Sequence, residues 1–262
     1  MPPVELNATR SGAGPSAVIA HGLFGSARNW SSIARRLAVG RCVHALDMRN
    51  HGASPWADEM TYPAMAEDLL FHIGRHGLSR PILIGHSMGG KAAMAAALAA
   101  PHRIGRLIVV DIAPVRYRHG FASLVDALTA LDLDGVDRRG DADARLADAV
   151  PDAALRGFLL QNLVLRGGRY VWRLNLAAIA AARQSLQDFP DLPPSAVFDG
   201  PTLVLGGGES DYLRPDHAPA IGRYFPNAER RWIPGAGHWP HADRPDAFVA
   251  AVEDFLGRTG GR

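Results

Sequence analysis

The sequence predicts an α/β fold, in which helices cover a mostly parallel central sheet. Short aliphatic runs of strand length recur along the chain with helix-like stretches between them, a pattern typical of parallel strands buried on both faces. The runs span residues 17–20, 43–46, 81–84, 107–110 and 202–205. The 262 residues also fit a single large domain with a sizeable core.

Further elements follow in chain order. The residues before Gly14 form an edge strand, and Thr61 caps a helix that has Pro63 in its first turn. Met65, Leu69 and Ile73 line one side of that helix. Residues 87–100 predict another helix, whose many alanines allow close packing against the sheet, and residues 230–233 form the last strand-like run.

Residues 114–200 depart from this alternation of strand-like and helix-like segments, and their pattern predicts a helical lid. Two helical faces are apolar, the first made of Phe121, Leu124, Val125, Leu128 and Leu131, the second of Leu155, Phe158, Leu159 and Leu163. The alternation of Tyr170, Trp172 and Leu174 predicts a short strand. Because the block lies between two strands of the sheet, we expect residues 1–113 and 201–262 to form a core that carries it.

Charge and cysteine content narrow the classes of function. The 28 basic and 26 acidic residues give a net charge of +2, and all basic residues except Lys91 are scattered arginines. No basic patch for nucleic acid is evident, and the longest apolar run, residues 92–100, is too short to span a membrane. A lone Cys42 and a start without an apolar signal core indicate a reducing, cytoplasmic setting.

One motif predicts a catalytic nucleophile. The strand at 81–84 runs directly into Gly85-His86-Ser87-Met88-Gly89, and a helix follows. A G-x-S-x-G sequence in this context forms a sharp turn that exposes the serine hydroxyl, with glycines where a Cβ would clash. The alternative is a glycine-rich turn with an incidental serine. The strand–turn–helix context favours Ser87 as a nucleophile.

A serine nucleophile needs a base, and His238 is the strongest candidate. It lies in the loop Gly235-Ala-Gly-His238, which follows the last strand-like run. His241, three residues later, is a rival. No cluster of acidic or cysteine ligands accompanies these two histidines, so we expect neither a metal site nor any other cofactor.

The acid that orients the histidine has two candidates. Asp111 and Asp211 both follow strands, and both satisfy the chain order serine, aspartate, histidine. Each could instead cap a turn. The residues alone divide the two about evenly.

An oxyanion formed on the substrate needs backbone donors. The Met88 amide directly follows the nucleophile, and the turn His21-Gly-Leu-Phe-Gly-Ser26 after the first core strand supplies the second donor. We select the Leu23 amide, with Phe24 next to it, against the alternative of a plain tight turn.

Five blocks of sequence together resemble the α/β-hydrolase superfamily and, within it, the small YbfF-type bacterial esterases and their mitochondrial relatives. They span nearly the whole chain in family order. The blocks are His21-Gly-Leu-Phe-Gly-Ser26, Asp47-Met-Arg-Asn-His-Gly-Ala-Ser-Pro55, Gly85-His-Ser-Met-Gly-Gly-Lys91, Asp111-Ile-Ala-Pro114 and Ala236-Gly-His-Trp239.

The resemblance implies an α/β-hydrolase fold with a helical lid inserted after the strand that ends near Asp111. It implies a hydrolase of acyl esters or thioesters with Ser87 as nucleophile and His238 as base. In the YbfF-type group the acid corresponds to Asp111 and a serine resembling Ser210 assists, whereas in the wider superfamily the acid stands where Asp211 lies. We therefore expect Asp111, with Asp211 as the alternative and Ser210 as an accessory residue.

The expected substrate is a small-molecule carboxylic ester, or an acyl thioester, bound between sheet and lid. Phe24, Met88 and Trp239 are predicted wall residues because they adjoin the proposed catalytic residues. The few charges in the apolar faces of the lid favour small, uncharged acyl groups of short to medium length.

Other activities remain open on the same residues. Ser87 argues against the dehalogenases and epoxide hydrolases of this superfamily, which use an aspartate nucleophile. Perhydrolase, lactonase or carbon–carbon hydrolase chemistry would use the same triad. The fold can also serve as a non-catalytic binding or partner-protecting module.

Overall fold

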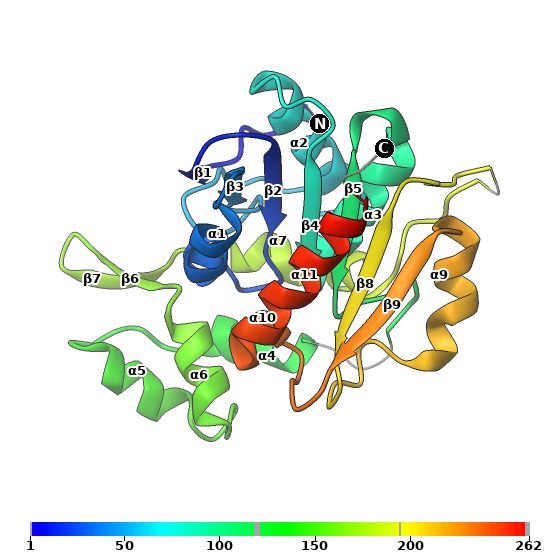
Figure 1. The fold of residues 1–262 in the computed structure, drawn as a ribbon. Coiled ribbons are helices and arrows are strands. Elements are labelled where there is room, and N and C mark those ends of the chain that lie inside the picture. Colours follow the sequence, from blue (N-terminus) through cyan, green and yellow to red (C-terminus); the bar gives the residue numbers. More distant parts are fainter. Residues whose placement is uncertain (1, 118–120, 194, 260–262) are drawn as a thin grey trace.

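The predicted α/β fold is confirmed by a computed structural model that describes residues 2–117, 121–193 and 195–259. Seven strands form one sheet in the order β1-β3-β2-β4-β5-β8-β9, and β1 alone runs antiparallel to its neighbour (Figure 1). The bounds are β1 Ala8–Ser11, β2 Ser16–Ala20, β3 Cys42–Leu46, β4 Ile82–His86, β5 Arg106–Val110, β8 Thr202–Gly207 and β9 Ala228–Ile233. Each apolar run predicted from sequence is a strand, and the predicted edge strand is β1.

Helices cover both faces of the sheet (Figure 1). One face packs against α1 and α11, and the other against α2, α3 and α9. Their bounds are α1 Ser31–Leu37, α2 Tyr62–Arg75, α3 Met88–Ala99, α9 Ala218–Tyr224, α10 Pro240–Asp243 and α11 Pro245–Thr259, with 3-10 turns η1 Ala27–Trp30, η2 Pro101–Arg103 and η3 Pro215–His217. Thr61 caps α2 as predicted, since its hydroxyl accepts a hydrogen bond from the Ala64 amide at 3.3 Å.

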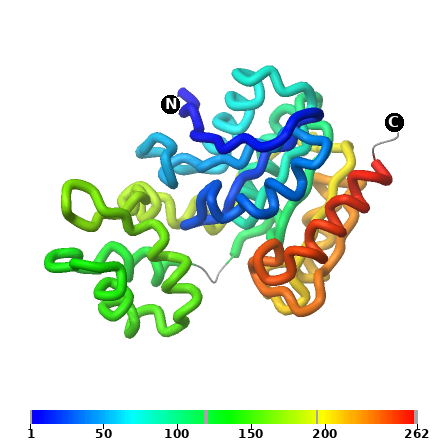
Figure 2. Tube along the Cα trace, turned by 60° about the vertical axis from the view of Figure 1, so that its left-hand side comes forward, coloured from blue at the N-terminus to red at the C-terminus, as the bar shows by residue number. Residues whose placement is uncertain are grey.

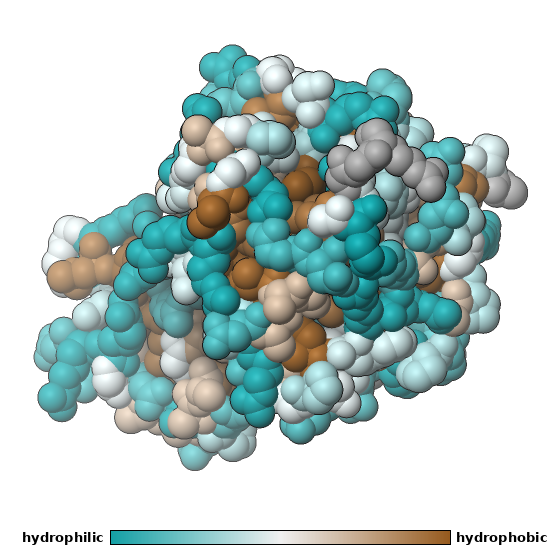
Figure 3. Space-filling model, viewed as in Figure 1, coloured by the Kyte–Doolittle hydropathy of each residue, from teal (hydrophilic) through white to brown (hydrophobic). Residues whose placement is uncertain are grey.

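The chain between β5 and β8 forms a separate group of short elements beside the sheet (Figure 2). They are α4 Ala122–Ala130, α5 Arg139–Leu146, α6 Ala153–Leu160, the hairpin of β6 Leu163–Arg166 and β7 Arg169–Trp172, α7 Leu176–Ala181 and α8 Arg183–Gln187. Its apolar side chains join the same buried cluster as α2 and α3. On the face drawn in Figure 3, hydrophilic residues prevail and apolar ones are scattered among them.

One prediction within this group is wrong. Leu163 was expected on the helical face of Leu155, but α6 ends at Leu160 and Leu163 begins β6, opposite Trp172. Asn162 side-chain Nδ2 donates to the Leu159 carbonyl at 3.2 Å, which satisfies a carbonyl at the end of the helix. Leu163 lies four positions after Leu159, and an apolar residue at this spacing fits either the same face of a helix or the first residue of a buried strand. The strand predicted at Tyr170 and Trp172 is present as β7, and Leu174 lies beyond it.

Candidate active site

Ser87 occupies the sharp turn between β4 and α3. Its backbone has φ of +50°, a left-handed conformation that is strained for serine. The flanking glycines are required by close backbone approach. A Cβ on Gly85 would lie 2.3 Å from the Gly89 carbonyl oxygen, and one on Gly89 would lie 2.4 Å from the carbonyl oxygen of Ala20.

Three side chains from distant parts of the chain meet at this turn. His238 Nε2 lies 3.0 Å from Ser87 Oγ, and His238 Nδ1 lies 2.8 Å from Asp111 Oδ2. Because an ionised carboxylate only accepts, Nδ1 carries the ring proton and Nε2 accepts from the serine hydroxyl. This arrangement can move a proton from serine to imidazole.

Asp111 is fully buried at the end of β5. Its Oδ1 accepts from the Gly207 amide at 3.0 Å, and its Oδ2 also accepts from the Ser210 hydroxyl. These donors stabilise the ionised carboxylate away from water. Asp211, in contrast, is exposed and has no hydrogen bond or ion pair with any residue that the structure describes. The structure thus brings Asp111, and not Asp211, to His238.

Two buried histidines hold the turn that follows β2. The Phe24 amide donates to His51 Nε2 at 3.1 Å, while His51 Nδ1 donates to the Arg49 carbonyl at 2.9 Å. His21 accepts from the Met48 amide through Nε2 at 2.9 Å. Burial lowers the pKa of His51 to about 3, so this ring is neutral and can accept at neutral pH.

This turn lies directly against the serine. A Cβ on Gly22 would come 3.2 Å from Ser87 Cβ. The Phe24 amide is engaged with His51, whereas the amides of Leu23 and Met88 donate to no acceptor among the residues described. Leu23 and Met88, the two residues predicted to supply these amides, line the same cavity as Ser87.

A side chain from the segment between β5 and β8 also holds this turn. Asn162 is buried, and its Nδ2 donates to the Phe24 carbonyl at 2.7 Å. Sequence reasoning missed Asn162 because its acceptor is a backbone oxygen 138 positions away. No local pattern marks such a residue.

His238 has partners on its backbone and on one face of its ring. His86 Nε2 donates to the His238 carbonyl at 2.8 Å, and the Tyr212 ring stacks on the imidazole with centroids 3.9 Å apart. The rival His241 instead stacks on Trp30 at 3.9 Å. Burial lowers the pKa of His241 to about 3, so this ring is a neutral packing element.

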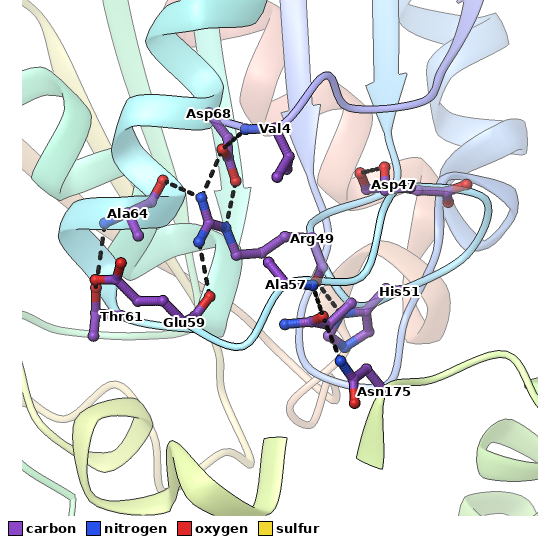
Figure 4. Close-up of polar contacts among 12 residues, drawn as sticks. Val4, Asp47, Arg49, His51, Ala57, Glu59, Thr61, Ala64, Asp68 and Asn175 are labelled. Atoms are coloured by element: carbon purple, nitrogen blue, oxygen red, sulfur yellow. Dashed lines mark hydrogen bonds and ion pairs between the residues drawn. The ribbon is translucent and has the colours of Figure 1, made fainter. Parts of the chain in front are cut away.

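The loop after β3 is fixed to neighbouring segments by an ion pair and by hydrogen bonds. Arg49 and Asp68 form a buried ion pair at 2.6 Å, as Figure 4 shows. Asn50 Oδ1 accepts from Asn175 Nδ2 at 3.1 Å, which joins this loop to the start of α7. Asp47 accepts from the Ala27 amide at 2.7 Å and so holds the start of η1.

The cavity at Ser87 has a volume of about 310 Å³ and is mainly apolar. The predicted wall residues Phe24, Met88 and Trp239 all line it. Residues of the segment between β5 and β8 form much of its remaining wall, namely Tyr117, Phe121, Leu124, Leu155, Phe158, Leu186 and Gln187.

No group of three or more histidine, cysteine, aspartate or glutamate side chains is arranged to hold a metal ion in the part of the chain described. Among the same residues, every helix is too short or too polar to cross a bilayer.

Comparison with known proteins shows the family. Residues 16–245 match the family model of the α/β-hydrolase fold. The sn-1-specific diacylglycerol lipase ABHD11 of Mus musculus is 42% identical over 250 residues, which cover 92% of this chain and 81% of that protein. The esterase YbfF of Escherichia coli is 36% identical over 242 residues, which cover 91% of this chain and 92% of that protein.

A solved structure agrees with these relatives. The solved structure of a marine microorganism esterase superposes with a TM-score of 0.94 at 37% identity, and the match covers 97% of this chain and all of that one. The chain belongs to the α/β-hydrolase family and, within it, to the YbfF-type esterases.

Proposed function

We propose that this chain, a carboxylic ester hydrolase by its family, cleaves its substrate through an acyl-enzyme on Ser87. The observation that carries the proposal is the position of His238 between two groups. Its Nε2 lies 3.0 Å from Ser87 Oγ, and its Nδ1 lies 2.8 Å from Asp111 Oδ2. The expected roles are Ser87 as nucleophile, His238 as base and Asp111 as the acid that orients it.

The reaction has two steps. Ser87 Oγ attacks the ester carbonyl while His238 takes its proton, and the imidazolium then protonates the departing alcohol. Water attacks the acyl-enzyme with His238 again as base, which releases the acid and restores Ser87. The amides of Leu23 and Met88 would stabilise the oxyanion in both steps, and the engagement of the Phe24 amide by His51 supports the choice of Leu23.

Residues 114–200 act in this proposal as a lid over the acyl-binding cavity. The volume of about 310 Å³ and the apolar wall favour an uncharged acyl chain of short to medium length, as an ester or a thioester. The buried free thiol of Cys42 supports a reducing, cytoplasmic setting.

Matched amide substitutions test the assignment of the acid. Hydrolysis of p-nitrophenyl butyrate is measured for Asp111→Asn and Asp211→Asn, each of which removes one charge and preserves shape. Asp111→Asn should lower kcat by about 10⁴, because the wrong tautomer of His238 is then favoured. Asp211→Asn should stay near wild type. The reverse result would identify Asp211 as the acid.

A covalent probe tests the nucleophile. An alkyl fluorophosphonate should label the folded protein at Ser87, and Ser87→Ala should neither be labelled nor hydrolyse the ester. Folded protein that resists the probe and lacks ester hydrolysis would favour a binding module.

A further inference from the structure

Lys91, the chain's only lysine, is buried in α3 four residues after Ser87. Its Nζ donates to the carbonyl oxygens of Val115 at 2.9 Å, Gln187 at 3.0 Å and Asp188 at 2.6 Å. An ammonium group has three protons, so the three acceptors match its full donor capacity.

These acceptors lie at the two places where the chain passes between the sheet and the residues from α4 to α8, first after β5 and then after α8. We call these two places the chain crossings. Val115 follows β5, and Gln187 is the last residue of α8. The Tyr117 amide donates to the Gln187 carbonyl at 2.9 Å, so the two crossings also contact each other. Lys91 is bonded to both.

Two tyrosines complete the surroundings of the ammonium group. Nζ lies 5.4 Å from the ring centre of Tyr62 on α2 and 4.8 Å from that of Tyr117, distances typical of cation–π contacts. The Tyr62 hydroxyl donates to the Leu186 carbonyl at 2.7 Å and fastens the second crossing independently.

Two charged side chains bear on Lys91 among the residues that the structure describes, those of Asp188 and Arg116. Burial lowers the pKa of Lys91 to about 7, while the Asp188 carboxylate opposes that shift. Arg116 lies 3.7 Å from the same carboxylate. Burial also raises the pKa of both Tyr62 and Tyr117, so both phenols remain neutral beside the ammonium group.

The same residues form a wall of the cavity at Ser87. Lys91, Tyr62, Tyr117, Leu186 and Gln187 all line it. Lys91 lies four residues after Ser87, a rise of about 6 Å along the helix, so an acyl chain that extended along α3 from the reacting carbonyl would reach this wall.

We propose that Lys91 is a positioning residue for ester hydrolysis, whose ammonium group fastens both chain crossings to α3 and so sets the acyl-binding wall. The effect on catalysis rests on the proposed function, because the wall matters only if an acyl group binds there. Without the ammonium group, three buried carbonyl oxygens lose their donor, and water or movement of both crossings must compensate.

The kinetic test compares p-nitrophenyl acetate, butyrate and octanoate in wild type, Lys91→Met and Lys91→Arg. Lys91→Met should raise KM for octanoate at least about tenfold, the effect of losing charge-assisted hydrogen bonds, and should raise KM for acetate much less. Lys91→Arg, which keeps charge and donors, should recover part of this loss. Equal KM changes for all three esters, or none, would overturn the proposal.

Arg41→Met is the matched control. Arg41 pairs with Glu253 at 2.6 Å and so fastens distant segments by a charge, but it does not line the cavity at Ser87. Its KM ratio between octanoate and acetate should equal that of wild type. A shift as large as that of Lys91→Met would assign the effect to general destabilisation and overturn the proposal.

A structural readout needs no substrate. Hydrogen exchange of peptides covering residues 115–117 and 186–188 should accelerate at least about tenfold in Lys91→Met, while exchange in α3 remains unchanged. Unchanged exchange at both crossings would overturn the proposal. If instead the wild-type protein hydrolyses none of the esters but Lys91→Met shows the accelerated exchange, the proposed function fails and the structural role of Lys91 stands.

Wild-type protein supplies a second measurement that does not depend on a variant. With ¹⁵N-labelled lysine the chain gives a single Nζ signal, because it has one lysine. At pH 6, below the lowered pKa of about 7, a fully bonded, buried ammonium group should have protons that exchange slowly enough to be observed. A signal that exchanges as fast as that of an exposed lysine would contradict the proposal.

Discussion

Three residues with left-handed backbones surround the candidate site. Phe24, Ser87 and Asp111 have φ of +62°, +50° and +51°. Such conformations are costly for residues with a Cβ and persist where the surrounding structure enforces them. Hydrogen bonds hold all three backbones, since the Ser87 amide donates to the Val110 carbonyl at 3.0 Å, the Asp111 amide to the Leu205 carbonyl at 2.9 Å and the Phe24 amide to His51 Nε2. The strain therefore accompanies the positioning of Ser87 and Asp111, on which the proposed chemistry depends, and of Phe24, which lines the cavity.

Ser210 offers a test of the acid's surroundings. Its hydroxyl donates to the same Asp111 oxygen that faces His238. Ser210→Ala should lower kcat for p-nitrophenyl butyrate about fivefold, the worth of about one hydrogen bond. The exposed Ser79→Ala is the control and should match wild type. An unchanged kcat in Ser210→Ala would remove the accessory role of this serine.

Residue types alone favoured Ser87 and His238 as candidates, and the structure brings these two together, but residue types could not choose between the two aspartates. Both Asp111 and Asp211 follow a strand and precede the histidine in the chain, so local sequence patterns do not distinguish them. They differ in that the Gly207 amide donates to Asp111, a contact between adjacent strands β5 and β8. Strand neighbours are set by tertiary packing, which local sequence does not encode.

At the scale of elements, several hydrogen bonds that join the residues from α4 to α8 to the rest of the protein are accepted by backbone carbonyl groups of distant residues. Lys91 and Asn162 both donate to carbonyl groups far away in the chain. Any residue can supply a carbonyl, so these pairings leave no mark in the sequence. Apolar periodicity, in contrast, is present in the sequence, and it predicted the helices and the central strands. The end of α6 at Leu160 was not predictable, because the apolar pattern continues past it to Leu163.

The Asn162 contact predicts an effect on the turn proposed to hold the oxyanion. Asn162→Ala removes the donor to the Phe24 carbonyl, so the adjacent Leu23 amide should be held less firmly. We expect kcat for p-nitrophenyl butyrate to fall about tenfold, less than the 10²–10³ lost when an oxyanion donor is removed. KM should change little.

Asn227→Ala is the corresponding control. Its Nδ2 donates to the Asp199 carbonyl at 2.6 Å on the surface, away from the cavity. This variant should keep the wild-type kcat. A kcat for Asn162→Ala as high as that of Asn227→Ala would show that the turn does not depend on the Asn162 donor.

For the molecule as a whole, buried histidines predict sensitivity to acid. Burial lowers the pKa of His51 to about 3 and of His72 to about 4, below the value of about 6.5 in an unfolded chain. Between these values the unfolded chain binds protons that the folded protein does not. The free energy of unfolding should therefore fall as pH decreases from about 6.5 towards 4.

Urea unfolding at pH 7.5 and pH 5.0 measures this effect. Each such histidine should contribute a loss of about 2 kcal/mol at the lower pH, since one pKa unit corresponds to about 1.4 kcal/mol. His72→Gln should show a smaller difference between the two pH values than wild type. Equal stability of the wild-type protein at both would contradict the buried, neutral state of these rings.

Capture of the acyl-enzyme tests the central claim most directly. Protein mixed with p-nitrophenyl butyrate is quenched with acid during turnover and digested, and its peptides are measured by mass spectrometry. The account predicts one butyryl group on the peptide that contains Ser87, and neither adduct nor turnover in Ser87→Ala. Turnover by Ser87→Ala at the wild-type rate, with no adduct in either protein, would contradict it.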